Sequence, residues 1–221
     1  MIVANHKMNM ILPDVLEYID KVSSISNRLI VCPSSIYIPY FVSSGFEVGI
    51  QNIYVGDNGA YTGEISAKQA KSVGVSYVIV GHSERRKVFG ESDELINHKV
   101  KSALQNGLNV ILCVGENEGE DYKEVIKKQI IFGLKDVTLP VLITYEPAWA
   151  IGSKQLPSNE KIIEVVDYIK SFFDYDVKVL YGGSVDENEA PTLSKVNNLD
   201  GFIVGLSSTD YDELITIREV L

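Results

Sequence analysis

Short apolar runs, rich in β-branched residues, recur along the chain and alternate with longer segments of mixed polarity. Within each short run most positions are apolar, whereas a half-exposed strand would alternate apolar with polar residues. Continuous apolar character is typical of parallel strands that are buried on both faces. The pattern predicts eight strands, over residues 2–4, 29–32, 48–50, 77–80, 110–114, 141–144, 178–180 and 201–204.

The longer segments between these runs carry apolar residues at helical spacing. In the first of them, Val15, Ile19 and Val22 recur every three or four positions, as on one face of a helix. Two later segments follow recognisable start signals, Ser92 in one case and Pro157 in the other. The predicted helices cover residues 13–26, 35–43, 66–73, 94–105, 121–134, 160–173, 187–196 and 210–220.

Strands and helices thus alternate eight times, which indicates βαβ units around a parallel sheet. Because such crossovers are right-handed, eight units close most simply into a barrel. On the pattern alone, a doubly wound open sheet remains the alternative. No linker rich in Pro, Gly or Ser interrupts the chain, so we expect residues 1–221 to form one α/β domain.

Composition and charge narrow the possible partners. The chain has 221 residues, and its 20 basic and 30 acidic side chains give a formal net charge of −10. Such a charge disfavours binding to nucleic acid or to anionic membranes, so neither is an expected partner. An anionic substrate would therefore need a local positive group at its binding site.

Cysteine usage and the apolar runs bear on the cellular compartment. Cys32 and Cys113 lie in separate predicted strands, without a Cys-x-x-Cys spacing, which predicts buried, reduced thiols. The sequence begins with a predicted strand and shows neither a signal-like segment nor an apolar run near the roughly 20 residues of a membrane span. We expect a cytoplasmic protein.

Polar and glycine-rich segments follow several of the predicted strands, where barrel enzymes place their active sites. Among them are an imidazole at His82, a carboxylate at Glu146 and an ammonium at Lys7. This set suits proton transfer next to a carbonyl group of an anionic substrate, and the glycines allow backbone N–H groups to approach a phosphate. No metal-ligand spacing and no Gly-x-Gly-x-x-Gly motif is present, so no metal or cofactor is expected.

Segment by segment, these residues resemble the triosephosphate isomerase family, and the resemblance spans the whole chain in order. The family signature Asn-x-Lys-Met-Asn is matched by Asn5-His6-Lys7-Met8-Asn9. The resemblance implies the (β/α)8 architecture known as the TIM barrel. The other matching segments are residues 51–52, 59–64, 81–86, 145–152, 181–185 and 200–205.

In that family a glutamate is the base and a neutral histidine is the electrophile. The resemblance implies these roles for Glu146 and His82, with Lys7 offsetting negative charge and Asn5 hydrogen-bonding the substrate. It implies interconversion of dihydroxyacetone phosphate and D-glyceraldehyde 3-phosphate through an enediol(ate), in glycolysis and gluconeogenesis. Phosphate binding is expected from the backbone N–H groups of Gly152, Ser184, Gly205 and Leu206.

The resemblance also implies a lid over residues 147–157 and a homodimer formed through the loop around Thr62. The chain departs from the family pattern in three places. The lid is shorter and lacks a second glycine, Leu206 stands where the family usually has glycine, and His6 stands where tryptophan is common. Strand alternation points His6 away from Lys7, so we assign it no catalytic role.

Two other functions are compatible with a barrel of this kind. One is an enzyme that acts on a larger sugar phosphate, which would favour a larger, more open lid. The other is a non-catalytic binding or surface protein, which would have no need of Glu146 and His82. The resemblance also implies that Glu84, Arg85, Cys113 and Glu116 surround the catalytic residues, with Glu84 either contacting Lys7 or shuttling protons.

Overall fold

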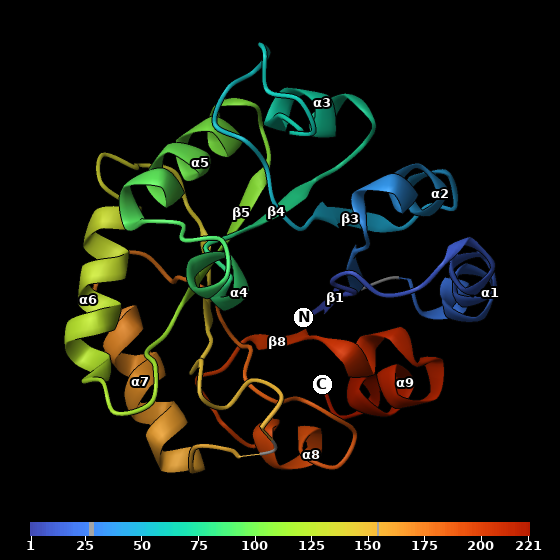
Figure 1. Cartoon of the computed structure of the whole chain (residues 1–221). Helices are drawn as coiled ribbons and strands as arrows, with labels where there is room; N and C mark the ends of the chain where they lie inside the picture. Colours follow the sequence, from blue (N-terminus) through green and yellow to red (C-terminus); the bar gives the residue numbers. More distant parts are fainter. Residues whose placement is uncertain (27–28, 154) are drawn as a thin grey trace.

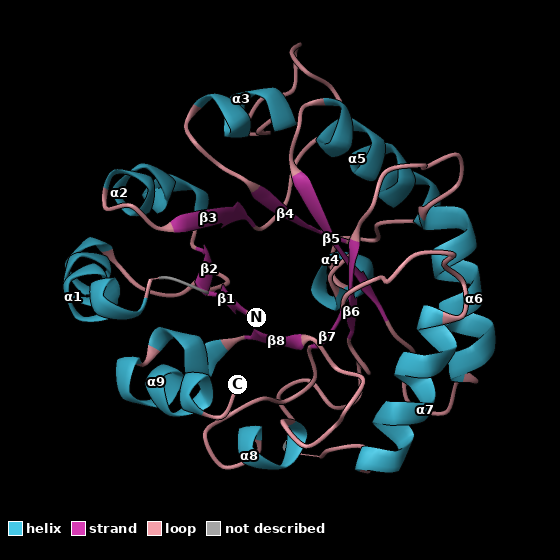
Figure 2. Ribbon diagram, turned by 180° about the vertical axis from the view of Figure 1, so that it is seen from behind, coloured by secondary structure: helices cyan, strands magenta, loops and turns pink. Residues whose placement is uncertain are grey.

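The computed structural model describes residues 1–26, 29–153 and 155–221. Parallel strands pair in chain order from β1 to β8 and close into a barrel, and the helices form an outer ring around it (Figures 1 and 2). The strands are β1 (Ile2–Asn5), β2 (Leu29–Cys32), β3 (Glu47–Ile50), β4 (Tyr77–Val80), β5 (Asn109–Val114), β6 (Leu142–Tyr145), β7 (Val179–Tyr181) and β8 (Gly201–Val204). All eight predicted strands are confirmed, and none is displaced by more than one residue at either end.

The outer ring follows the predicted alternation, with small differences. The segment over 13–26 divides into an α-helix and a 3-10 turn, η1 (Ser23–Ile25). The prediction over 187–196 is too long, because Asp186 accepts hydrogen bonds from the next N–H groups and forms a turn before the helix begins. The helices are α1 (Leu12–Val22), α2 (Ile38–Ser43), α3 (Ala67–Ser72), α4 (Ser83–Lys87), α5 (Asp93–Gln105), α6 (Tyr122–Gly133), α7 (Asn159–Lys170), α8 (Ala190–Leu193) and α9 (Tyr211–Glu219).

The seam between the first and last strands excludes the open sheet. Ile2 pairs with Phe202, and the next two residues of β1 continue the parallel register along β8. An added Cβ at Gly201 would lie 1.9 Å from the carbonyl oxygen of Met1, so the seam needs glycine at this position. The chain therefore forms a closed barrel and not a doubly wound sheet.

Side chains fill the barrel in two separate layers, one inside the strands and one between strands and helices. Along β1, Val3 points into the barrel, and its neighbours Ile2 and Ala4 pack outward under the helices. Cys32 and Cys113 lie in the inner layer as buried free thiols, as predicted. The inner layer consists of Val3, Ile30, Cys32, Ile79, Ile111, Cys113, Leu180 and Ile203.

His6 continues the alternation of β1 and lies outside the barrel. Its ring is 1% exposed and packs edge-on against Tyr18, with 4.8 Å between the ring centroids. Burial lowers the pKa of His6 to about 3, so the ring is neutral at physiological pH. The geometry agrees with the expectation that His6 points away from the catalytic residues. None of the helices in the described ranges is long and apolar enough to cross a membrane.

Candidate active site

A cavity of about 290 Å³ opens at the carboxyl ends of the strands. Such a volume is close to the lower end of the range for small-molecule sites, roughly 300–1,000 Å³. The cavity brings together every residue for which the sequence predicts a catalytic or binding role. These are Asn5, Lys7, His82, Glu146, Gly152, Ser184, Gly205 and Leu206.

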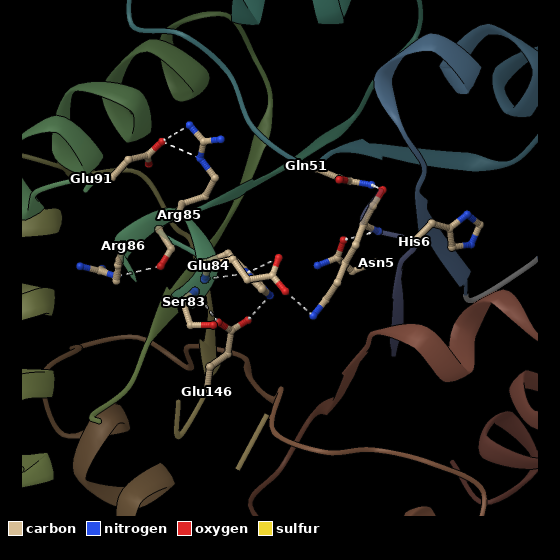
Figure 3. A network of polar contacts seen from close by, with 12 residues as sticks. Asn5, His6, Gln51, Ser83, Glu84, Arg85, Arg86, Glu91 and Glu146 are labelled. Carbon is tan, nitrogen blue, oxygen red and sulfur yellow. Dashed lines mark hydrogen bonds and ion pairs between the residues drawn. The ribbon is translucent and has the colours of Figure 1, made fainter. Parts of the chain in front are cut away.

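Glu146 follows β6 and has one of its two carboxylate oxygens held in place. Oε2 accepts a hydrogen bond of 3.1 Å from the backbone N–H of Ser83, a contact drawn in Figure 3. Oε1 is buried without a hydrogen-bond partner and lies 3.7 Å from Nε2 of His82. An added Cβ at Gly182 would come within 2.9 Å of the Glu146 Cγ, so glycine there leaves room for the carboxylate. One oxygen is thus fixed and the other is available to accept a proton.

His82 stands at the N-cap of α4 and is 7% exposed. Its Nδ1 accepts a hydrogen bond of 3.2 Å from the backbone N–H of Glu84. Because a backbone N–H can only donate, Nδ1 is the acceptor nitrogen and the proton of the neutral ring resides on Nε2. This places an N–H donor on the side of the ring that faces Glu146.

Lys7 follows β1 in a left-handed backbone conformation, with φ at +51°. Residues other than glycine adopt this conformation rarely, and it costs on the order of 1 kcal/mol or more. The carbonyl of Lys7 accepts hydrogen bonds from Gln51 Nε2 (2.8 Å) and Ser34 Oγ (3.1 Å), and its N–H donates to Asn5 Oδ1 (3.2 Å). These bonds hold the strained backbone. They also leave the Asn5 amide nitrogen available as a donor.

The Lys7 ammonium supplies the local positive charge that the acidic composition requires. Its Nζ lies 2.7 Å from Glu84 Oε1, which confirms the expected contact between these two residues. Burial by itself would raise the pKa of Glu84, but the hydrogen bond and charge of Lys7 outweigh it and lower that pKa. The ammonium is therefore oriented toward the mouth of the cavity by an ionised carboxylate.

Two glycines and a short turn also line the cavity, and a Cβ added at Gly205 would lie 3.8 Å from the Lys7 Nζ. Gly152 has φ at +68°, a conformation that favours glycine. Gly205 precedes the 3-10 turn η3 (Leu206–Thr209). Leu206 has no positive φ, and its side chain is 69% exposed. The leucine therefore occupies an ordinary turn conformation, and the residue lines the cavity.

The start of the expected lid is tied to Glu116, which lies in the loop after β5. Glu116 Oε1 accepts hydrogen bonds from Trp149 Nε1 (2.9 Å) and Tyr145 Oη (3.2 Å), and its carbonyl accepts one from the N–H of Ala148 (2.9 Å). The lid prediction over 147–157 includes Lys154, which lies outside the described residues. Glu116 thus lies against both sides of Glu146, through the Tyr145 side chain before it and the Ala148 backbone after it.

A buried charged cluster lies beside the mouth, behind α4. Glu91 contacts the guanidinium of Arg85 at 2.6 Å and the ammonium of Lys99 at 2.5 Å (the contact with Arg85 is drawn in Figure 3). Lys99 also donates to Asn52 Oδ1 at 2.7 Å. The cluster connects the loop after β3 to helix α5, next to the loop expected to form the dimer.

Several supporting groups escape a reading of the sequence. The Ser83 N–H that holds Glu146 is a backbone donor and has no side-chain signature. In the sequence, Gln51 belongs only to a family motif, although its side chain donates to the Lys7 carbonyl. Cys113 borders Glu146, and burial, reinforced by the charge of Glu146, raises the pKa of its thiol well above the ordinary value. This thiol remains protonated and is not a nucleophile.

Within the described ranges, no group of three or more His, Cys, Asp or Glu side chains is placed to hold a metal ion. The family model for triosephosphate isomerase matches residues 1–221. The chain belongs to the triosephosphate isomerase family. The activity is therefore that of the triosephosphate isomerases, the interconversion of dihydroxyacetone phosphate and D-glyceraldehyde 3-phosphate, an intramolecular aldose–ketose isomerisation in glycolysis.

Curated triosephosphate isomerases align along most of the chain, and two of them along nearly all of it. The protein from Alkaliphilus oremlandii is 34% identical over 240 residues, which covers 98% of this chain and 97% of the relative. The one from Aquifex aeolicus is 36% identical over 240 residues with the same coverage. The one from Mycoplasmopsis pulmonis is 42% identical over 176 residues, covering 76% of this chain and 71% of the relative. Both alternatives, a barrel for a larger sugar phosphate and a non-catalytic barrel, are thereby set aside.

Proposed function

We propose that Glu146 and His82 carry out the proton transfers of this isomerisation. Glu146 Oε1 removes a proton from the carbon next to the substrate carbonyl and returns it to the neighbouring carbon. His82 Nε2–H donates a hydrogen bond to the carbonyl oxygen as negative charge develops there, gives its proton to that oxygen, and takes the proton of the neighbouring hydroxyl, so the ring is neutral again at the end. The observation that carries this proposal is the unpartnered Glu146 Oε1, 3.7 Å from Nε2 of His82 in one cavity.

Lys7 and Asn5 stabilise the enediolate between the two transfers. Negative charge on the enediolate oxygens is attracted to the Lys7 ammonium at the edge of the cavity, and in a site with little water this attraction is strong. The Asn5 amide nitrogen donates to the same oxygens, because its Oδ1 already accepts from the Lys7 N–H. Both groups act most strongly when the substrate oxygens are most negative, so they favour the transition state over the bound substrate.

The substrate phosphate binds against the backbone N–H groups of Gly152, Ser184, Gly205 and Leu206, which line the same cavity. Neutral backbone donors bind a dianion without adding a second buried cation. This arrangement sets the distance between the phosphate and the reacting carbons. A cytoplasmic location completes the proposal, since Cys32 and Cys113 are free thiols.

The direct test is a steady-state assay with both triose phosphates in buffer that contains a metal chelator. We expect turnover in each direction, unchanged by the chelator or by added nucleotides, because every step uses side chains and backbone groups of the chain. Strict dependence of turnover on a divalent metal would contradict the proposed division of roles.

We further propose that the working unit is a homodimer formed through the loop around Thr62. This loop projects from the barrel beside α3 (Figure 1), and its neighbour Tyr61 is 48% exposed. At the mouth, Met8 follows Lys7 and is 96% exposed. A second chain covering these apolar side chains would remove them from water, which stabilises the assembly.

The dimer can be tested by sedimentation of the unmodified chain and of Thr62→Arg. We expect the unmodified chain to sediment as a dimer. The added charge at position 62 is expected to yield monomers with at least a tenfold lower kcat/KM, because the loop then leaves the neighbouring site. Lys68→Glu, on the nearby helix α3, provides a charge-changing control. A fully active monomer would refute the dimer as the working unit.

A further inference from the structure

Tyr18, on helix α1, makes a buried contact with η3, the 3-10 turn that follows the last strand, β8. Its side chain is 3% exposed, and its hydroxyl donates a hydrogen bond of 2.9 Å to the carbonyl oxygen of Ser208. The two residues are 190 positions apart in the sequence. Ser208 is fully buried within η3, so water does not compete for this hydrogen bond.

Ser208 in turn holds Gly205, which lines the phosphate end of the cavity. Its N–H and its Oγ both donate to the Gly205 carbonyl, at 2.9 and 2.7 Å. The turn therefore has a fixed internal geometry, and the Tyr18 hydroxyl joins that turn to the helix layer. Gly205 and Leu206 lie in the cavity wall, so this hydrogen bond connects helix α1 to that wall.

The ring of Tyr18 is itself immobilised by aromatic neighbours. His6 packs edge-on against it at 4.8 Å, and Phe41 lies 6.0 Å away at an angle of 63°. The backbone of His6 is fixed at both ends, because its N–H donates to the Cys32 carbonyl and its own carbonyl accepts from Asn9. Because the Tyr18 ring is held between these residues, its hydroxyl keeps a fixed position relative to η3.

We propose that Tyr18 is a positioning residue for phosphate recognition, acting through Ser208 on the N–H groups of Gly205 and Leu206. This inference rests on the proposed phosphate site. Loss of the hydroxyl leaves the η3 turn intact through its two Ser208–Gly205 bonds, but allows it to shift away from the cavity. The effect falls on binding of the phosphate group, because Glu146 and His82 are held by backbone N–H groups of α4 and not by η3.

The test compares substrates with and without a phosphate in Tyr18→Phe, which keeps the ring and removes the hydroxyl. For glyceraldehyde 3-phosphate we expect KM to rise roughly 5- to 20-fold with kcat changed less than about threefold. The inhibition constant of inorganic phosphate should rise by the same factor. For glyceraldehyde, which has no phosphate, kcat/KM should not change.

Tyr168→Phe is the matched control, because the Tyr168 hydroxyl donates to the Lys123 carbonyl at 3.1 Å on the outer surface, away from the cavity. It should alter none of these constants. Ser208→Ala removes the 2.7 Å bond to Gly205 and should shift the same two constants as Tyr18→Phe, which provides a second route if that variant folds poorly.

Unchanged KM and phosphate inhibition in Tyr18→Phe would overturn the inference, as would an equal loss of activity toward glyceraldehyde. Failure of the underlying phosphate site is distinguishable. In that case inorganic phosphate would not compete with glyceraldehyde 3-phosphate even in the unmodified chain.

Discussion

Replacing Glu146 by glutamine is expected to lower kcat by roughly 10³- to 10⁴-fold, the upper range for loss of a general base. The amide has the same shape, and its oxygen can still accept the N–H of Ser83 that holds Oε2 at 3.1 Å. It lacks the basicity to take a proton from carbon. The measurement is steady-state turnover with both triose phosphates, together with the unfolding midpoint in denaturant.

Glu118→Gln is a suitable control, since this glutamate is exposed in the loop after β5 and does not line the catalytic cavity. It should keep full turnover. Inorganic phosphate should still bind Glu146→Gln with an unchanged inhibition constant, because the phosphate end of the cavity is intact. Turnover within tenfold of the unmodified chain would show that another group is the base.

Replacing Lys7 by methionine is expected to lower kcat/KM by roughly 10³-fold, the loss typical for removing one group that stabilises the developing anion. Methionine retains most of the side-chain length and the β-carbon, so the backbone at φ +51° is under similar strain with either residue. The expected loss therefore measures the contribution of the Lys7 ammonium to kcat/KM and not a change in the fold. Lys101→Met, on helix α5 and paired only loosely with Asp136 at 3.5 Å, should have no effect.

A double variant separates the charge of Lys7 from its contact with Glu84. In Lys7→Met the Glu84 carboxylate loses the ammonium 2.7 Å away. Adding Glu84→Gln removes the unpaired charge and should restore the unfolding midpoint without restoring activity. Recovery of kcat/KM in the double variant would mean that Lys7 serves only to neutralise Glu84.

The barrel could be predicted from the sequence because each strand is short, apolar and buried on both faces. Such runs are compatible with few other kinds of secondary structure. Three of them, over 29–32, 77–80 and 201–204, coincide with β2, β4 and β8. Helix ends were harder, because they depend on local side-chain hydrogen bonds. At α8 the Asp186 side chain forms a turn where helical periodicity predicts helix.

The site residues could be predicted where a side chain carries the chemistry, as at Lys7, His82 and Glu146, which all line one cavity. Contacts that depend on three-dimensional proximity could not. In the sequence, Tyr18 is an ordinary buried position of helix α1, and none of the residues near it in the chain indicates that it contacts Ser208. Leu206 departs from the family's glycine, yet it has no positive φ and its side chain is exposed.

The seam between β1 and β8 has a consequence for the order in which the enzyme assembles. Ile2 pairs with Phe202, 200 positions later, and contacts this distant form late because chain entropy opposes them. Lys7 follows β1 and Gly205 follows β8, the two strands that form the seam. On the ribosome, the segments that carry His82 and Glu146 are synthesised before the strand that closes the seam. The complete cavity, which includes Lys7 and Gly205, therefore requires the last strand to be synthesised and docked.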